Sequence, residues 1–362
     1  MRIIQLYSSL SYGDAIGNDI LALDSIIKSK GYEARIFAEY IDSRISKDIA
    51  SAFSNYRPQK DDVIILHVGG ASKLNEWIKK APCSKKIMVY HNITPPVFFE
   101  PYSKKCADYC RSGLSQIASL KDTFDMVLAV SEFNKQNLLD MGYKCKINVL
   151  PILIPFSDYE KEPSAEILEK YNDDYTNIIF LGRIVPNKKQ QDVIAAFNSY
   201  QKNYNPKSRL FLIGNPRDFE NYGEQLKEYT KRLETSNVIF TGHTKFNEIL
   251  AYYKLSDLFL CMSEHEGFCV PLVEAMYFNI PILAYASSAI PSTLGGSGFV
   301  LKDKNPEVTA AVMNKILSED NLKKTILENQ AERLADFAHE KVAELFWNCI
   351  QTKDFWKDNK KN

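Results

Sequence analysis

Two carboxylates and a glycine lie close together in the segment 263–276, which directly follows a short apolar run. Pro271 suits the first turn of a helix, where the missing N–H of proline costs nothing. Free N–H groups at such a helix start favour an anion such as a diphosphate, and Gly267 lets the backbone approach it closely. Glu274 would then project from the first turn toward the hydroxyls of an adjoining ribose, and Glu266 on the loop would meet a sugar.

The same two carboxylates also suggest a glycosidase. If Glu266 and Glu274 lay on one helix, their separation in the sequence would place them about 12 Å apart along its axis. A hydrolytic pair needs about 5 to 9.5 Å. The spacing therefore disfavours hydrolysis, although a loop could shorten it. The plainest alternative is that Glu274 only interacts favourably with the dipole of its own helix.

A second group of residues, in the segment 180–189, supplies positive charge. Arg183 and Lys188 follow another apolar run and precede an expected helix. Arginine neutralises a pyrophosphate through its planar fork, and lysine does so as a point charge. A solvated basic loop would contain the same residues. Because this group and the segment 263–276 indicate the same anionic ligand, each supports the interpretation of the other.

The first half of the chain carries weaker signals. The loop 12–18 with Gly13 opens the first expected helix, but it lacks the Gly-x-Gly-x-x-Gly pattern of dinucleotide-binding proteins. His91 ends an apolar run, where a lone histidine is either a structural hydrogen bonder or a ligand contact. The histidines form no close-spaced pair, and Cys106 and Cys110 lack two further ligands nearby, so we expect no metal site.

The pattern of apolar runs predicts a parallel α/β architecture that would position these groups. Short, near-continuous apolar runs alternate with amphipathic segments, as in sheets covered by helices on both faces. The expected strands are 3–7, 34–37, 63–68, 87–90, 126–130 and 147–150 in the first half, and 178–181, 210–213, 238–241, 258–261, 282–284 and 299–301 in the second. Two doubly wound halves hold ligands at the carboxyl ends of their strands, so we expect a site in the cleft between two domains.

Other segments indicate how the two halves are joined. Pro151–Pro155 and the partly charged segment after it form the expected linker. The uncharged stretch 275–301 is long enough to span a membrane, but Asn, Pro and Gly interrupt it, so we interpret it as helix, buried strand and loop. From about 321 to 357 we expect helix, with late aromatic residues that need a surface to cover: Phe346, Trp347, Phe355 and Trp356.

The composition describes a globular chain with room for two domains. Its 362 residues include 45 Lys plus Arg and 45 Asp plus Glu. Zero net charge argues against a nucleic-acid partner, because proteins that wrap nucleic acid carry a basic excess. The N-terminal apolar run 3–7 is too short for a signal peptide, and seven scattered cysteines suit a reducing compartment. We therefore expect a cytoplasmic location.

Taken together, these residues resemble family four of the nucleotide-sugar glycosyltransferases. The resemblance lies in the Gly-Arg pair at 182–183 with Lys188, in the run 263–276 with its paired glutamates, and in Asn-Ile-Pro-Ile at 279–282. It covers essentially the whole chain and is strongest over 178–301. It implies the GT-B fold, in which two doubly wound Rossmann-like domains face an interdomain cleft. It also implies transfer with retained anomeric configuration, without a cofactor or a bound metal.

The resemblance implies roles for individual residues. Arg183 and Lys188 would bind the diphosphate, and the catalytic set would also include Glu266 and His91 near the sugar. The remaining donor contacts would be Gly13, Gly214, Asn215, His243, Gly267, Phe268, Cys269 and Glu274. As the sugar separates from the nucleoside diphosphate, cations and backbone donors would stabilise the leaving group, and the acceptor hydroxyl would attack from the same face.

Domain boundaries and partners follow from the same resemblance. An acceptor-side domain would comprise residues 1–155, with a C-terminal helix at about 340–362 packing back onto it, and a donor domain would comprise 156–339. The donor would be a nucleoside-diphosphate sugar, with a GDP-activated hexose such as mannose favoured over UDP sugars. The acceptor would be a glycan or a lipid-linked intermediate of surface polysaccharides. The basic and aromatic residues at 95–105 could touch the inner face of the membrane, or they could be ordinary packing and solvated surface.

Two residues depart from the family pattern. Asn279 stands where members commonly have glycine, and asparagine also tolerates the left-handed conformation of a helix C-terminus. Ser292 follows Pro291 where many members have an acidic residue, which leaves the role of that loop open. Three other functions also stay open: a nucleotide-sugar 2-epimerase, a phosphorylase that uses free phosphate, and a non-catalytic sugar-nucleotide sensor.

Overall fold

The computed structural model describes residues 2–11 and 13–351, and the chain divides into two compact units. The first unit comprises Met1–Pro95, Asp108–Pro155 and Asp336–Asn362, and the second comprises Pro96–Ala107 and Phe156–Ala335. The predictions for Tyr12, Phe355, Trp356 and the polar tail lie outside the described residues.

The first unit is built on a parallel sheet with the strand order β3-β2-β1-β4-β5-β6-β7. Its strands are β1 (Arg2–Leu10), β2 (Glu33–Ile41), β3 (Ala50–Ala52), β4 (Val63–Val68), β5 (Lys85–Tyr90), β6 (Met126–Ala129) and β7 (Lys146–Val149). Every residue of β4 is buried, as its continuous apolar sequence requires in a sheet covered on both faces. The direction of winding reverses between β1 and β4, so their carboxyl ends form the topological switch point.

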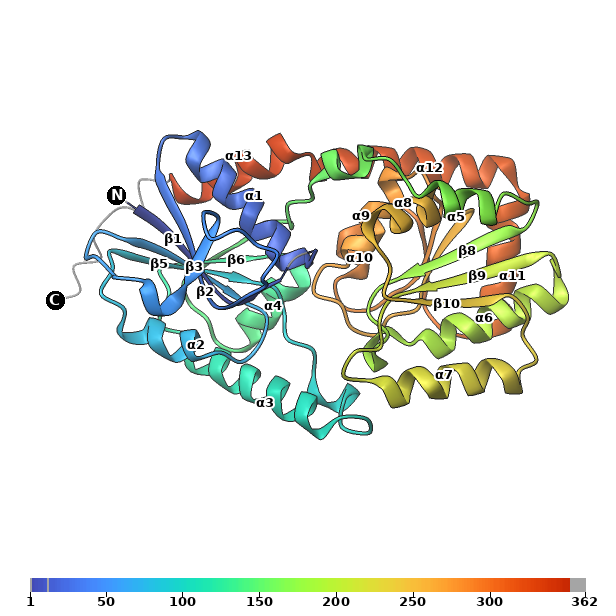
Figure 1. Ribbon diagram of the computed structural model, residues 1–362, viewed down its shortest axis with the longest axis horizontal. Helices are drawn as coiled ribbons and strands as arrows, with labels where there is room; N and C mark the ends of the chain where they lie inside the picture. The colour runs from blue at the N-terminus through green and yellow to red at the C-terminus, as the bar shows by residue number, and fades with distance from the viewer. Residues whose placement is uncertain (1, 12, 352–362) are drawn as a thin grey trace. The chain divides into compact units, whose positions relative to one another are not determined.

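Helices cover both faces of this sheet. On one side lie α1 (Ala15–Ser29) and α13 (His339–Ile350), and on the other lie α2 (Lys73–Trp77), α3 (Lys104–Ser119) and α4 (Glu132–Asp140) (Figure 1). Asp14 caps α1, since its side chain accepts a hydrogen bond from the Gly17 N–H at 3.4 Å. Trp347 of α13 stacks on Tyr32, with 5.5 Å between ring centroids, so one of the late aromatic residues covers a surface of this unit.

The second unit contains a six-stranded parallel sheet with the order β10-β9-β8-β11-β12-β13. Its strands are β8 (Thr176–Leu181), β9 (Ser208–Ile213), β10 (Val238–Gly242), β11 (Leu258–Cys261), β12 (Ile282–Tyr285) and β13 (Phe299–Leu301). Its helices are α5 (Ala165–Lys170), α6 (Gln190–Asn203), α7 (Glu220–Arg232), α8 (Phe246–Lys254), α9 (Val270–Tyr277), α10 (Ile290–Leu294), α11 (Pro306–Ser318) and α12 (Asp320–Leu334). In Figure 1, α6 and α7 lie on the opposite side of this sheet from α8 and α9.

A short excursion of the chain, Pro96–Ala107, packs with the second unit, although the sequence analysis placed it in the first domain. Phe99 contacts Phe219 with 4.9 Å between ring centroids, and Tyr102 contacts Tyr222 at 5.1 Å. Aromatic pairs of this kind contribute a favourable free energy in addition to that from burial of their apolar area. Hydrophobic contact therefore holds this segment against α7 and the loop before it.

Every expected strand is present, and two features differ from expectation. Strand β3 was missed because three residues are too short to show an apolar period. The helix expected from about 321 to 357 is present in the described residues but interrupted: α12 ends at Leu334, a 3₁₀ turn covers Ala335–Phe337, and α13 starts at His339. The boundary between the two units falls at this break. Asn279 adopts φ 55° just after α9, which confirms the expected left-handed helix end.

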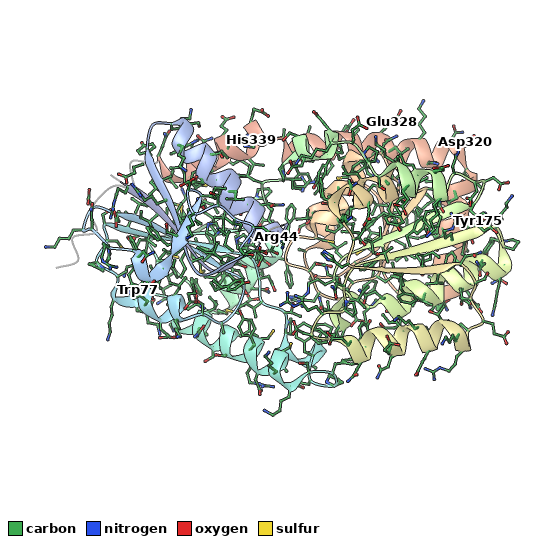
Figure 2. The ribbon with its side chains drawn as sticks, in the orientation of Figure 1. Arg44, Trp77, Tyr175, Asp320, Glu328 and His339 are labelled. Atoms are coloured by element: carbon green, nitrogen blue, oxygen red, sulfur yellow. The ribbon has the colours of Figure 1, made fainter. Side chains whose placement is uncertain are left out.

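One buried side chain fixes α12 against its sheet. The Gln330 amide donates to the Ile280 carbonyl at 2.8 Å and accepts from the Ile282 N–H at 2.9 Å. Asp320 and Glu328 lie on the outer side of the same helix and are exposed (Figure 2). A single helix thus presents amide hydrogen bonds to the sheet and carboxylates to water.

Among residues 2–11 and 13–351, no helix has the length and hydrophobicity needed to cross a bilayer. The uncharged stretch 275–301 divides into the end of α9, strand β12, the short helix α10 and strand β13, with loops between them. The interpretation of that stretch as helix, buried strand and loop is confirmed.

Candidate functional site

The second unit brings two loops together at its topological switch point. Strands β8 and β11 are neighbours, yet the chain winds outward from them in opposite directions. The loops after their carboxyl ends therefore diverge and leave a place for a ligand. One loop carries Arg183 and Lys188, and the other carries Glu266 and Gly267. The two groups of residues that were singled out in the sequence thus flank the same point of the sheet.

The loop after β8 lies against the end of β9. The Ile184 N–H donates to the Asn215 carbonyl at 3.1 Å, and Gly214 forms a bridge with Gly242, next to His243. A Cβ atom at Gly214 would lie 1.9 Å from the Gly182 carbonyl oxygen, so only glycine allows this approach. The structure therefore brings the expected base-binding residues Gly214, Asn215 and His243 next to the Arg183 loop.

Arg183 is exposed, and its side chain makes no hydrogen bond or ion pair with any of the described residues. Its backbone is fixed, because the Gln190 amide donates to the Arg183 carbonyl at 2.9 Å. A guanidinium on a fixed backbone with no internal partner has all of its donors available for an anionic ligand.

Lys188 and Glu266 form an ion pair between the two loops, with 2.6 Å between Nζ and Oε1. Their side chains are 17% and 9% exposed, so the pair is nearly excluded from water. Burial acts to lower the pKa of Lys188, but the Glu266 carboxylate and Cys269 outweigh it, and the pKa is raised. Lys188 is therefore a cation at neutral pH, held in place by the carboxylate beside it.

The backbone around Glu266 is held by several side chains. Asn187 donates to the His265 carbonyl at 2.9 Å, and the Glu266 N–H donates to the Ser288 hydroxyl at 2.7 Å. Burial lowers the pKa of His265 to about 4, so this imidazole is neutral at physiological pH. Two distant segments of the chain thus fix the loop before Gly267.

Helix α9 begins at this loop in an unusual conformation. Cys269, the residue before the helix, adopts φ 74°, and Pro271 occupies the first turn, as predicted. The Thr293 hydroxyl donates to the Phe268 carbonyl at 2.6 Å and so fixes the orientation of the peptide that enters the helix. A helix start with free N–H groups attracts an anion, and Lys188 beside it adds a full positive charge.

Glu274 lies in α9, and each of its carboxylate oxygens accepts a hydrogen bond from a tyrosine. The Tyr159 hydroxyl donates to Oε1 at 2.8 Å and the Tyr253 hydroxyl to Oε2 at 2.6 Å. Burial raises the pKa of Glu274, and these two hydrogen bonds act against that rise. A carboxylate oxygen can accept more than one hydrogen bond, so Glu274 keeps capacity for the hydroxyls of a ribose.

The first unit places its candidates around its own switch point. Gly13 is exposed and has φ 75°. His91 follows β5 and is buried, with 3.1 Å from its Nε2 to Nδ1 of His67 and 3.9 Å from its Nε2 to Oδ2 of Asp19. The side chain of Gln5 on β1 completes the group, 2.9 Å from Nε2 of His67. His91 therefore belongs to a buried polar cluster.

Two clusters of the described residues bring together side chains that could ligate a metal: Asp19 with His67 and His91, and Cys261 with Glu266 and Cys269. In the first, His67 is already hydrogen-bonded through both ring nitrogens. In the second, Glu266 is paired with Lys188, whose positive charge opposes a cation. Neither donor set therefore suits a metal ion well.

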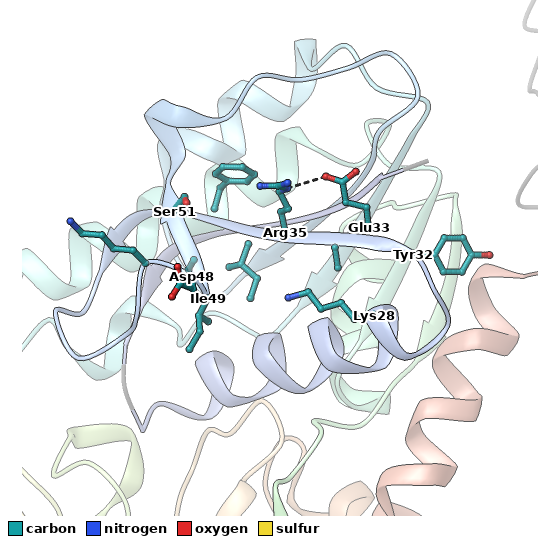
Figure 3. A pocket seen from close by; sticks show the side chains of 12 residues that line it. Lys28, Tyr32, Glu33, Arg35, Asp48, Ile49 and Ser51 are labelled. Atoms are coloured by element: carbon teal, nitrogen blue, oxygen red, sulfur yellow. Dashed lines mark hydrogen bonds and ion pairs between the residues drawn. The ribbon is translucent and has the colours of Figure 1, made fainter.

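A hollow of about 460 Å³ lies elsewhere, at the edge of the first sheet (Figure 3). It is lined by the first half of β2 and the segment before β3, and its Arg35 and Glu33 side chains form an ion pair with 3.0 Å between the charged atoms. This is the amino end of β2, whereas ligands of parallel sheets bind at the carboxyl ends. The hollow is therefore not part of the candidate site.

Comparison with known proteins identifies the second unit. Residues 161–333 match the family model described as Glycosyl transferases group 1. The second unit is therefore similar to group 1 glycosyltransferases over most of its length. The candidate site residues Arg183, Lys188, Glu266 and Glu274 all lie inside the matched region.

Similarity to known proteins extends beyond the residues that the family model matches. An uncharacterized glycosyltransferase of Methanocaldococcus jannaschii is 27% identical over 211 residues, which is 57% of this chain and 52% of the relative. The serotype-specific mannosyltransferase WbdA of Escherichia coli is 23% identical over 282 residues, 72% of this chain and 32% of WbdA. The chain therefore matches about half of the first relative and about a third of the second.

Solved structures agree on the fold. The crystal structure of HepE from Anabaena, in complex with UDP and glucose, superposes with a TM-score of 0.70 at 18% identity, covering 97% of this chain and 99% of HepE. The fold of this chain is GT-B, with two Rossmann-like units, as the sequence predicted.

Sequence reasoning missed several residues that support the site. Tyr159 and Tyr253 reach Glu274 from distant parts of the chain, and no local pattern indicates such contacts. Asp19 likewise lies in the middle of α1, where it looks like an ordinary helix residue. Only His67 left a signal, because a histidine inside the otherwise apolar run 63–68 needs a buried hydrogen-bond partner.

Proposed function

We propose that this glycosyltransferase moves a hexose from a nucleoside-diphosphate sugar to a glycan or a lipid-linked acceptor, with retention of anomeric configuration and without a metal. The observation that carries the proposal is the buried Lys188–Glu266 pair, which joins the two loops at the switch point of a group 1 glycosyltransferase domain. A fixed cation at this point suits a ligand whose diphosphate gains charge during the reaction.

The chemistry follows from where charge develops. As the bond between the sugar and the diphosphate breaks, the sugar becomes positively charged and the leaving diphosphate gains negative charge. Lys188, Arg183 and the N–H groups at the start of α9 stabilise the leaving group, because they are in place before the reaction begins. These groups take the part that a divalent metal plays in other transferases, which supports metal-independent transfer.

The residues around the ribose and the sugar complete the proposed donor site. Glu274, fixed by two tyrosines, accepts hydrogen bonds from the ribose hydroxyls. Backbone at Gly214, Asn215 and His243 contacts the base. Glu266 and the backbone of Gly267, Phe268 and Cys269 contact the sugar. From the first unit, the proposal assigns a donor-phosphate contact to Gly13 and a sugar contact to His91.

We propose retention by attack on the face that the diphosphate leaves, because Glu266, the carboxylate expected near the sugar, is not a suitable nucleophile. Glu266 is held by Lys188, which makes its oxygen a poor attacking group. The acceptor hydroxyl attacks from the face that the diphosphate leaves, and a phosphate oxygen takes its proton. The new bond to the acceptor oxygen forms on the same face, so the configuration is retained.

For the donor we favour a GDP-activated mannose-like hexose. The relative WbdA is a mannosyltransferase, which supports this choice, whereas HepE was crystallised with UDP and glucose and makes a UDP sugar the alternative. For the acceptor we favour an intermediate of polysaccharide biosynthesis. The relative CapM of Staphylococcus aureus, a capsular polysaccharide biosynthesis glycosyltransferase 25% identical over 58% of this chain, supports that choice.

A cytoplasmic location with peripheral contact to the inner face of the membrane would suit a lipid-linked acceptor. In the excursion 96–107, Val97 is 61% exposed, and Lys104 and Lys105 are also exposed. An exposed apolar side chain and two exposed lysines in one short segment suit an anionic lipid surface. Sedimentation with anionic vesicles tests this part, and a Val97→Asp variant should bind them less.

The experiment that tests the proposed function is a transfer assay with EDTA present. Sugar donors of GDP, UDP and ADP are each offered with a panel of glycan and lipid-linked acceptors, and the anomeric configuration of the product is read by NMR. We expect one donor base to support transfer with retention. An inverted product would refute the proposed course of reaction, and isomerised sugar without transfer would identify a 2-epimerase instead.

A further inference from the structure

A chain of hydrogen bonds runs from β1 through β4 to His91 in the first unit. Gln5 on β1, His67 on β4 and His91 after β5 are all buried, and their strands are neighbours near the switch point. The links are 3.0 Å from Nε2 of Gln5 to the Ile20 carbonyl, 2.9 Å from Oε1 of Gln5 to Nε2 of His67, and 3.1 Å from Nδ1 of His67 to Nε2 of His91. Such a chain fixes which atoms carry protons.

The first link sets the orientation of the glutamine. The Ile20 carbonyl can only accept a hydrogen bond, so the group of Gln5 that faces it must be the NH₂. The other end of the amide, which faces His67, is therefore the oxygen, and it can only accept. Nε2 of His67 must carry a proton in order to donate to it.

The second link sets the tautomer of both histidines. Burial lowers the pKa of His67 well below its usual value, so the ring is neutral and carries one proton, on Nε2. Its Nδ1 is then an acceptor. The only remaining donor across the 3.1 Å contact is Nε2–H of His91. Since burial lowers the pKa of His91 to about 3, that ring is also neutral.

The tautomer of His91 determines the hydrogen-bonding state of its other ring nitrogen, Nδ1. With its proton on Nε2, His91 has a bare lone pair on Nδ1. This atom is buried and has no hydrogen-bond partner among the described residues. Buried polar atoms without a partner are rare in folded proteins and point to a ligand or water that supplies the missing hydrogen bond. Here the missing partner must be a donor, because the nitrogen can only accept.

We infer that Gln5 and His67 are positioning residues that hold His91 in the Nε2–H tautomer, so that its Nδ1 accepts a hydrogen bond from a hydroxyl of the bound substrate. The inference rests on the proposed function only in assigning that hydroxyl to the transferred sugar. A hydroxyl donates readily to a neutral imidazole nitrogen, whereas a deoxy or fluoro substituent at that position cannot. The relay, which is the hydrogen-bonded chain of Gln5, His67 and His91, therefore makes His91 selective for one sugar hydroxyl.

One further group faces this relay. Oδ2 of Asp19 on α1 lies 3.9 Å from Nε2 of His91, too far for a hydrogen bond, and Oδ1 accepts from the Leu153 N–H at 2.8 Å. Burial raises the pKa of Asp19 to about 7, so above that pH its carboxylate is an acceptor that also favours a proton on Nε2 of His91, and Asp19 then reinforces the tautomer that the relay sets.

The first test reads the tautomer without any turnover. In protein labelled with ¹⁵N in its histidines, long-range ¹H–¹⁵N correlation spectra at pH 7 distinguish protonated from bare ring nitrogens. We expect a bare Nδ1 and a protonated Nε2 in both His67 and His91, with spectra of His91→Gln and His67→Gln used for assignment. A proton on Nδ1 of His91 in the wild-type protein would overturn the inference, whether or not any donor is known.

The second test changes the start of the relay. Gln5→Met removes both hydrogen bonds of the amide while it keeps the size of the side chain, and Gln5→Glu keeps an acceptor toward His67. We expect a mixed His91 tautomer in Gln5→Met and the wild-type tautomer in Gln5→Glu. An unmixed His91 tautomer in a folded Gln5→Met would overturn the role of Gln5. If Gln5→Met does not fold, the wild-type spectrum still decides.

The third test connects the tautomer to specificity. Donors lacking each sugar hydroxyl in turn are compared with the complete donor by kcat/KM. We expect Gln5→Met to lower the discrimination at one hydroxyl by about 3- to 10-fold, the value of one neutral hydrogen bond, and to leave the affinity for the free nucleoside diphosphate unchanged. Unchanged discrimination at every hydroxyl would overturn the inference, whereas absence of any donor turnover would count against the proposed function instead.

Discussion

The two tyrosines that hold Glu274 give a sharp prediction. Replacement of Tyr253 by phenylalanine removes one hydroxyl and leaves the ring, which stacks on Phe278 with 4.8 Å between centroids and 6° between planes. The lost hydrogen bond, 2.6 Å long, ends on a half-buried carboxylate. Hydrogen bonds to charged groups contribute about 1.5 to 3 kcal/mol, so the free energy of unfolding should fall by about that amount when Glu274 is ionised.

The sign of the pH dependence follows from the same contact. Burial already raises the pKa of Glu274, and the tyrosine hydroxyls oppose that rise, so the variant should have a still higher pKa at this carboxyl. The folded variant then holds a proton at a pH where the unfolded chain has released it. The loss of stability should therefore be largest at pH 8 and should shrink as the pH falls toward 5.

Urea unfolding at pH 8 and pH 5 measures this difference. The matched control is Tyr222→Phe, because Tyr222 is also buried in the second unit but the acceptors within reach of its hydroxyl, the side-chain oxygens of Gln190 and Gln191, carry no charge. The control should lose about the same stability at both pH values. Equal losses at pH 8 and pH 5 in Tyr253→Phe would refute the claim that the tyrosine supports an ionised Glu274.

Three further changes test other parts of the account. Lys188→Ala should reduce turnover by roughly 10²- to 10³-fold, as for loss of one donor to a developing anion. It should also destabilise the protein, because Glu266 stays buried without its partner. Near-normal kinetics would exclude Lys188 from the donor site. Gly214→Ala should abolish nucleotide binding, since the new Cβ would lie 1.9 Å from the Gly182 carbonyl oxygen, and tight binding in a calorimetric titration would contradict this. Burial raises the pKa of Asp19 to about 7, so the folded protein should lose free energy of unfolding as the pH rises from about 4 to 7, by about 1.4 kcal/mol per pH unit. In chemical denaturation, Asp19→Asn should lack this decline. The same slope in the variant as in the wild-type protein would show that Asp19 titrates normally.

The architecture was largely predictable from the sequence because it depends on local patterns. Strands such as Val63–Val68 and Leu258–Cys261 are continuous apolar runs, and these mark buried parallel strands wherever they occur. The break between α12 and α13 was not predictable, since the amphipathic pattern continues through residues 335–338. The short edge strand Ala50–Ala52 likewise has too few residues to reveal a period.

The site was predictable in part. Arg183, Lys188 and Glu266 could be found because each follows an apolar run, and the carboxyl ends of parallel strands converge. The direct pairing of Lys188 with Glu266 joins residues 78 positions apart and depends on which strands become neighbours. The tyrosines at Glu274 and the glutamine at the start of the histidine relay were beyond sequence reasoning for the same reason. Tertiary contacts of single side chains produce no periodic pattern in the sequence.

The central claim is that the second unit binds a nucleoside-diphosphate sugar through Lys188. Calorimetric titration of the protein with GDP-mannose, UDP-glucose and ADP-glucose in the presence of EDTA tests it most directly. We expect one of these donors to bind with 1:1 stoichiometry and Lys188→Ala to weaken its binding strongly, while Lys227→Ala, which removes an exposed lysine of α7, should leave it unchanged. Binding that is equally strong in both variants, or no binding of any nucleotide sugar to the wild-type protein, would contradict the account.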